Sequence, residues 1–208
     1  MNPSALLWKT LQALLGLLFS CTVSVAAAPL TPLEGLELLR RGFAGMTDFT
    51  AEITQEKQLA LMKKKLSASG LVRFRKPDSF YMEISSPYAS RLLLKNTELT
   101  ILYPREGTRQ KLALPPEEGL GVWFGHLDQP MKSLPDGVDV RAERHGETCV
   151  VRIAPKGKGG VKELALTFLA DGRIRRLVIE EQNGDNTSIA FRNMKKNVGL
   201  TDKDFLLE

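Results

Sequence analysis

About eleven short stretches in which apolar and polar residues alternate fill the chain from Phe49 onward, and they restrict the fold more than any other feature. In the first stretch, Phe49, Ala51 and Ile53 alternate with polar residues, which is the pattern of a half-buried strand. The stretches cover residues 49–54, 66–75, 79–85, 90–95, 98–103, 108–114, 138–144, 148–154, 162–169, 173–181 and 186–193. The turn signals between them are Pro77-Asp78, Asn96-Thr97, His145-Gly146, Asp171-Gly172 and Asn183-Gly184. This pattern predicts one antiparallel sheet, sandwich or barrel.

One amphipathic helix is predicted before the strands. Thr31 is a suitable N-cap, Pro32 suits the first turn, and Glu34 stands three residues after the cap. Apolar residues then recur at helical spacing: Leu33, Leu36, Leu39, Phe43 and Met46. We therefore expect this helix to lie with one face against an apolar surface.

The N-terminus has the pattern of a secretory signal peptide. Lys9 precedes an apolar run at residues 11–19, and small residues lead to Ala27, after which we expect cleavage. Residues 28–208 would then form a single mature domain, and its net charge would fall from +5 to +4. Leu18-Phe19-Ser20-Cys21 leaves an alternative open, since it weakly matches the site at which bacterial lipoproteins are acylated on cysteine.

Motifs for catalysis or metal binding are missing from the sequence. It contains no Gly-x-Ser-x-Gly elbow and no His/Cys/Asp spacing suited to a metal, and both histidines stand beside glycines. The mild positive charge does not fit a nucleic-acid binder. Cys149, the one cysteine expected after cleavage, excludes an internal disulfide. We expect a binding protein that is not an enzyme and uses no cofactor or metal.

A Pro- and Gly-rich break at residues 115–137 separates the two groups of strands. A segment of this length inside a small domain is usually functional, and often a lid. Bulky apolar residues in it would cover an opening in the sheet: Trp123, Phe124, Leu127 and Met131.

The hairpin at residues 69–87 has two unlike faces. One face is apolar, with Val72, Phe74, Phe80, Met82 and Ile84, and we expect the other to be mostly solvated, with Leu71, Arg73, Arg75, Tyr81 and Glu83. The apolar face fits a packed core or the wall of a cavity. A single helix is little cover for such a sheet, so we expect a cavity, with Phe49, Leu99, Ile101 and Tyr103 also lining it.

These residues resemble the periplasmic outer-membrane lipoprotein carrier (LolA) family over nearly the whole mature chain. The resemblance rests on Phe49-x-Ala51-x-Ile53-x-Gln55, Ser69-Gly70-Leu71, Arg75-Lys76-Pro77-Asp78-x-Phe80, Pro87, Leu99-x-Ile101-x-Tyr103-x-Arg105, Asp171-Gly172-x-Ile174, Glu181-Gln182-Asn183-Gly184-Asp185 and Phe191-x-Asn193. It implies an α+β fold, in which an incomplete antiparallel barrel of about eleven strands is closed by helices over a hydrophobic cavity.

The resemblance also implies a function. The cavity would take acyl chains of lipoproteins or related lipids, and the protein would be a monomeric periplasmic carrier of a Gram-negative bacterium. Its partners would be an acylated cargo, an inner-membrane release complex and an outer-membrane receptor. In the family an arginine before the proline holds the lid. Here the pair is reversed to Arg75-Lys76, so either side chain could stand at the rim, or both could belong to a solvated strand face.

Two other functions fit the same resemblance. An outer-membrane-anchored receptor of related fold is expected if Cys21 is acylated. Envelope-stress regulators that sense lipid also contain a LolA-like domain, but they carry an extra C-terminal domain, for which we see no room after Asn193.

The intact mass of the secreted protein tests the N-terminal assignment. We expect a mature chain that starts at Ala28 and carries no lipid, because the small-residue cleavage site fits better than the cysteine site. A diacylated chain that starts at Cys21 would contradict this and favour the receptor.

Overall fold

The computed structural model describes residues 28–61, 64–85, 87, 89–114, 121, 129–157 and 159–207. The elements in chain order are β1 (Ala28–Leu30), α2 (Pro32–Phe43), β2 (Asp48–Leu59), β3 (Lys64–Arg75), β4 (Ser79–Ile84), β5 (Ser90–Lys95), β6 (Glu98–Tyr103), β7 (Thr108–Ala113), β8 (Val138–His145), β9 (Thr148–Pro155), β10 (Val161–Leu169), β11 (Ile174–Glu181), β12 (Asn186–Lys196) and the short 3-10 helix η2 (Asp202–Phe205).

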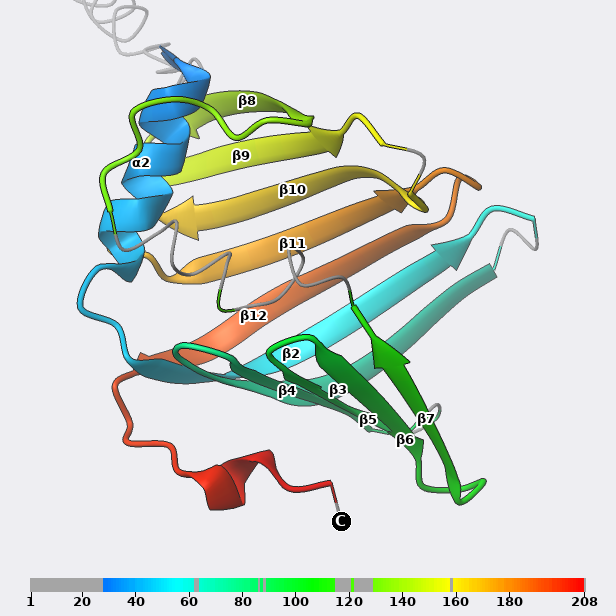
Figure 1. The fold of residues 1–208 in the computed structure, drawn as a ribbon. Helices are drawn as coiled ribbons and strands as arrows, with labels where there is room; N and C mark the ends of the chain where they lie inside the picture. Colours follow the sequence, from blue (N-terminus) through cyan, green and yellow to red (C-terminus); the bar gives the residue numbers. More distant parts are fainter. Residues whose placement is uncertain are drawn as a thin grey trace, which may run out of the picture.

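The twelve described strands form one antiparallel sheet in the order β1-β8-β9-β10-β11-β12-β2-β3-β4-β5-β6-β7. Figure 1 shows that the sheet curves strongly and carries α2 on its concave face. In the described part of the chain β1 and β7 are the two edges, so the sheet does not close. The predicted fold class, an incomplete antiparallel barrel with an N-terminal helix, is confirmed. The three-residue strand β1 is an addition that the alternation pattern did not reveal.

The predicted helix start is confirmed in detail. The Thr31 hydroxyl accepts a hydrogen bond from the Glu34 backbone N–H at 3.3 Å, and the Glu34 carboxylate accepts one from the Thr31 N–H at 2.8 Å. This reciprocal pair satisfies two backbone donors that the first helical turn leaves open. The chain therefore enters α2 at a fixed angle directly after β1.

Two glycines let α2 lie unusually close to the sheet. A Cβ added to Gly35 would stand 2.2 Å from Cβ of Ala142 on β8, and one added to Gly42 would stand 2.5 Å from Cα of Gly172 in the β10–β11 turn. Gly172 has a φ of +79°, which glycine adopts without strain. Lys196 completes this contact, since its ammonium donates to the carbonyl oxygens of Gly42, at 3.0 Å, and Asp171. The helix is thus fixed over β8–β11.

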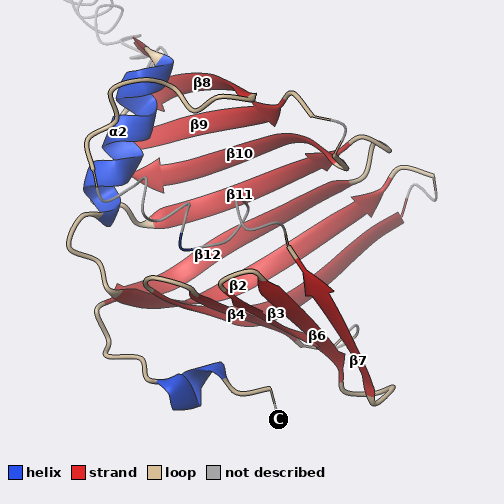
Figure 2. Ribbon diagram, in the orientation of Figure 1, coloured by secondary structure: helices blue, strands red, loops and turns tan. Residues whose placement is uncertain are grey.

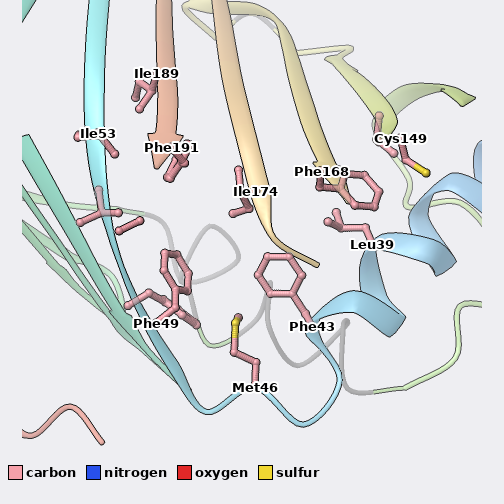
Figure 3. Packing of buried hydrophobic residues seen from close by; sticks show 14 of the residues in the cluster. Leu39, Phe43, Met46, Phe49, Ile53, Cys149, Phe168, Ile174, Ile189 and Phe191 are labelled. Carbon is pink, nitrogen blue, oxygen red and sulfur yellow. The ribbon is translucent and has the colours of Figure 1, made fainter. Parts of the chain in front are cut away.

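The hydrophobic core fills the space between α2 and the sheet. Figure 3 shows Leu39 and Phe43 of the helix pointing toward Phe168 and Ile174 of β10 and β11. The core continues through Phe49 and Phe74, whose ring centroids are 5.4 Å apart. Its buried members are Leu36, Leu39, Phe43, Met46, Phe49, Ala51, Ile53, Val72, Phe74, Ile84, Val140, Cys149, Val151, Phe168, Ile174, Ile189 and Phe191. Cys149 is a free thiol within this core.

After β12 the chain crosses to the convex face of the sheet. The buried carboxylate of Asp48 accepts hydrogen bonds from the backbone N–H groups of Val198, at 2.7 Å, and Gly199, at 3.2 Å. The Asn197 side chain accepts a bond from the Thr47 N–H at 2.8 Å. Figure 2 shows η2 beyond this crossing, on the side of the sheet opposite α2. Within the described residues, none of the helices combines the length and apolar content needed to cross a membrane.

Replacing Gly42 with alanine should destabilise the protein, although alanine favours helices. In an exposed helix this change stabilises by about 1 kcal/mol. Here the new methyl group would collide with the Gly172 backbone, so we expect the free energy of unfolding to fall by about 1–3 kcal/mol in urea denaturation.

Gly157 provides the control, because nothing lies within 4 Å of a Cβ added there. Gly157→Ala should change the free energy of unfolding by less than about 0.5 kcal/mol. A Gly42→Ala protein as stable as the parent would show that α2 does not pack this closely.

Candidate functional site

The strand register brings one apolar stripe across the concave face from β3 to β6. Val72 on β3 stands opposite Met82 on β4, Met82 opposite Leu92 on β5, and Leu92 opposite Ile101 on β6. Because side chains alternate between faces along each strand, residues paired in this way point to the same side. The apolar face predicted for the hairpin is therefore one continuous surface, and it is the face that carries α2.

A hollow of about 310 Å³ lies on this surface, where the packed core ends at Met82 and Ile84. Its volume falls at the lower end of the range of about 300–1,000 Å³ found for small-molecule pockets. Strands β2 to β6 supply its lining: Gln55, Lys57, Leu66, Ser67, Ala68, Met82, Ile84, Ser90, Leu92, Ile101 and Tyr103. We call this space the hollow.

The predicted cavity residues divide into two groups. Met82, Ile84, Ile101 and Tyr103 line the hollow, and Ile84, with 5% of its surface exposed, also belongs to the packed core. Phe49, Val72 and Phe74 point to the same face but lie in the packed core, with 4%, 1% and 1% of their surfaces exposed. Phe80 is half-buried against that core, and Leu99 is half-buried on β6. In this structure only the first group faces space that a ligand could occupy.

Several lining residues were not predicted. Leu66 and Ala68 continue the alternation of β3, so the same period extended toward the strand's start would have found them. Leu92 lies in a run of three leucines, Leu92 to Leu94, where alternation is invisible. Gln55 and Lys57 are polar, and only the pairing of β2 with β3 shows that they border the hollow.

The end of the hollow nearest the β2–β3 turn is polar. The Lys57 ammonium lies 3.3 Å from a carboxylate oxygen of Glu181 and 3.9 Å from one of Asp185. All three side chains are partly buried, and the single lysine is shared by two carboxylates, so the cluster keeps a net negative charge. An apolar chain in the hollow would therefore lie with one end at Met82 and Ile101 and the other beside a polar, charged border.

Of the four predicted lid residues, Trp123, Phe124 and Leu127 lie outside the described residues. Met131 is described, and its side chain packs against the core. Its backbone N–H donates to the Glu37 carboxylate on α2 at 3.5 Å. Hydrogen bonding from Arg40, at 2.7 Å, holds the pKa of Glu37 at about 2, so this carboxylate is charged at neutral pH.

The face with Arg73, Arg75 and Tyr81 is not mostly solvated, as the sequence suggested, because the C-terminal segment covers part of it. Arg75 forms an ion pair with Asp202, and its guanidinium lies 5.2 Å from the centre of the Phe205 ring. Arg73 donates to the Asp204 carbonyl at 3.0 Å. Alternation along β3 could not reveal a cover that comes from the far end of the chain.

Tyr81 is buried on this convex face, with 3% of its surface exposed. The Arg73 guanidinium lies 5.4 Å from its ring centre, and its hydroxyl donates to Glu83 at 3.0 Å. Burial, aided by the hydrogen bond and charge of Glu83, raises the pKa of Tyr81 to about 12. Lys76 lies in the turn between β3 and β4, where its backbone N–H donates to the Thr47 carbonyl at 2.8 Å.

Arg75→Ala should loosen the C-terminal segment. The change removes a cation–π contact and a partly exposed ion pair, so we expect the free energy of unfolding to fall by about 1 kcal/mol. Residues after Leu200 should be removed faster by carboxypeptidase. Arg141→Ala, which breaks an ion pair with Glu163 on another part of the surface, is the control. Unchanged digestion together with altered cargo release would instead favour the lid-holding role.

In the described ranges, no three His, Cys, Asp or Glu side chains come together in a group that could hold a metal ion. The hollow is lined mainly by apolar side chains and has an ion cluster at one border, an arrangement suited to holding an apolar group.

Comparison with solved structures finds a similar fold in another protein. An uncharacterized conserved protein from Thermus thermophilus matches with a TM-score of 0.52 and 15% identity, over 85% of this chain and 93% of that one. A LolA superfamily protein from Nitrosomonas europaea matches with a TM-score of 0.46 and 13% identity, over 86% and 98%. A chain of the Pseudomonas aeruginosa MucA/MucB complex gives 0.48 and 10%, over 86% and 62%.

Two comparisons used the sequence. A search of curated proteins found no match. The sequence profile of the family described as outer membrane lipoprotein carrier protein LolA matches residues 44–208, which include every strand from β2 to β12. The chain therefore belongs to the LolA family of outer membrane lipoprotein carrier proteins.

Proposed function

We propose that this protein is a periplasmic carrier that binds an acyl chain of a lipoprotein or related lipid in the hollow. The carrier collects its cargo at the inner membrane and delivers it toward the outer membrane, without catalysing a reaction on it. A release complex supplies the cargo and a receptor accepts it. Membership of the LolA family and the secretory pattern of residues 1–27 support this assignment.

The observation that carries the proposal is the apolar hollow beside a well-packed core. Apolar side chains that line an open space remain in contact with water. The free energy falls when an acyl chain displaces that water from them. Leu66, Met82 and Leu92 supply such surface from three neighbouring strands. Each methylene group buried on them stabilises the complex by about 0.8 kcal/mol.

Transport also requires that binding be reversible. The small volume of the hollow and its polar border at Lys57 limit how much of a lipid can be enclosed. An acyl chain held on one side by half-buried residues can leave without unfolding the core. We infer moderate affinity, which suits a protein that must hand its cargo on.

Neighbouring leucines on β5 test the proposal. Leu92 lines the hollow, whereas Leu93 pairs with Tyr81 and points to the convex face, and both are half-buried. Leu92→Glu places a charge where the acyl chain should lie, so we expect at least a tenfold loss of binding to a palmitoylated lipopeptide, measured by fluorescence titration. Leu93→Glu should bind within about twofold of the parent.

Met82→Glu extends this test to the neighbouring strand β4. It should keep a cooperative thermal transition, because a glutamate at the wall can reach solvent, but it should lose lipopeptide binding. Outright unfolding of this variant would place Met82 in the core. Normal binding by both Met82→Glu and Leu92→Glu would exclude the hollow as the cargo site.

A further inference from the structure

The strand β7 is an open edge of the sheet. In the described part of the chain it pairs on one side only, with β6, and Figure 1 shows it at the border of the curved sheet. All six of its residues are exposed. An edge of this kind can accept a further strand from another polypeptide, because its outer backbone groups are free to form a second ladder of hydrogen bonds.

The register shows which backbone groups of β7 point outward. The Leu114 N–H donates to the Thr97 carbonyl at 2.7 Å, so these two residues form a hydrogen-bonded pair. The pairing of β6 with β7 continues from there without a shift, and hydrogen-bonded pairs alternate with non-hydrogen-bonded pairs along an antiparallel ladder. Arg109, Lys111 and Ala113 therefore turn their N–H and carbonyl groups away from β6, toward the place of an added strand.

The side chains of β7 give this edge two unlike faces. Leu112 has 57% of its surface exposed on the concave face, where it extends a row that runs inward through Leu99 and Leu94. Arg109 and Lys111 alternate with it and point to the convex face. A strand added at this edge would meet an apolar neighbour on one face and cations on the other.

Basic side chains outnumber acidic ones in this part of the sheet, and the turn before β7 adds one charge of each sign. Strands β4 to β7 hold four cations and two carboxylates, a net charge of +2: Arg91, Lys95, Arg109, Lys111, Glu83 and Glu98. The ammonium of Lys111 lies 3.1 Å from Glu98, but the two side chains are 63% and 61% exposed, so this ion pair contributes little. Arg109 donates to the Leu207 carbonyl at 3.1 Å, a neutral group that leaves its charge in place.

We propose that β7 takes up an extended, acidic segment of the cargo polypeptide as an additional strand, while the acyl chain of the cargo lies in the hollow. Acidic side chains at every second position stand opposite Arg109 and Lys111, and the apolar side chains between them lie beside Leu112. Opposite charges placed directly across two strands stabilise their pairing. This inference rests on the proposed carrier function and adds to it a site for the peptide part of the cargo.

The hollow and the edge are close enough for one molecule to occupy both. Ile101 and Tyr103 on β6 line the hollow, and they stand opposite Gln110 and Thr108 on β7. Since neighbouring strands lie about 4.8 Å apart, a peptide attached to an acyl chain in the hollow crosses only one or two strand spacings to reach the edge. The two contacts strengthen each other, because the second forms within one complex.

A second copy of this chain fits the edge less well than an acidic peptide. When two β7 strands pair antiparallel about Gln110 or Lys111, basic side chains of one copy stand opposite basic side chains of the other. Like charges in this arrangement destabilise the pair, and lysine on an edge strand is a common means of preventing such association. The same charges favour a strand of opposite sign.

Palmitoylated peptides that differ only in their peptide part test the proposal on the full chain as its host processes it. One carries glutamate and valine at alternate positions, and a second carries glutamine in place of glutamate. The acidic peptide should bind about fivefold more tightly in fluorescence titration, since two cross-strand charge pairs contribute. N-methylation of its glutamate amides, which removes the donors that face β7, should weaken it about tenfold. N-methylation of its valine amides, which point away from β7, should leave binding within about twofold.

Matched protein variants locate the charge preference. Arg109→Gln with Lys111→Gln should abolish the preference for glutamate over glutamine. Arg141→Gln with Lys156→Gln removes one arginine and one lysine that form exposed ion pairs elsewhere, on β8 and just after β9, and should keep the preference at about fivefold. Both variants should bind the glutamine peptide as the parent does, because the hollow is unchanged.

The results separate failure of this inference from failure of the carrier function. A preference lost only in the β7 variant, with the methylation effect confined to the glutamate amides, supports strand addition. Equal binding of the acidic, neutral and N-methylated peptides would overturn it and leave the carrier function intact. A glutamate preference that survives in the β7 variant, or is lost equally in the control variant, would overturn it in favour of general charge attraction. Failure of every palmitoylated peptide to bind would overturn both.

Discussion

The close contact of α2 with one half of the concave face is the constraint on which the rest of the structure depends. Gly35 and Gly42 bring the helix backbone against β8 and the β10–β11 turn, and Lys196 fixes its C-terminal end. A helix held there covers the part of the sheet around Phe168 and Phe49, where the core is packed. It leaves the far ends of β2–β6 without helical cover in the described residues, and the hollow lies there.

The two faces of the β3–β4 hairpin consequently serve different purposes. The concave face changes along its length from core, at Val72 and Phe74, to open surface, at Met82. The convex face is closed by the C-terminal segment through Arg75 and Phe205. The sheet at this point is therefore supported from behind while its inner face stays accessible. A binding wall of this kind keeps its shape when the space in front of it is empty.

Local sequence patterns predicted most of the fold, whereas features that depend on distant segments escaped them. Strand positions and the helix cap follow from alternation, turn dipeptides and the Thr31–Glu34 pair. The period also assigned Met82 and Phe74 to one face. It could not show that Phe74 lies in the packed core while Met82 borders the hollow, because that depends on how distant segments pack on the sheet. The partners of Arg75 were equally hidden, since Asp202 lies 127 residues along the chain.

Methyl NMR during titration with a palmitoylated lipopeptide tests the central claim most directly. With methionine and isoleucine methyl groups labelled, the signals of Met82, Ile84 and Ile101 should shift and show contacts to the acyl chain, because these side chains line the hollow. Met46 and Ile174, which are buried in the core under α2, should stay unchanged. Saturating binding that leaves Met82 and Ile101 unshifted would contradict the account.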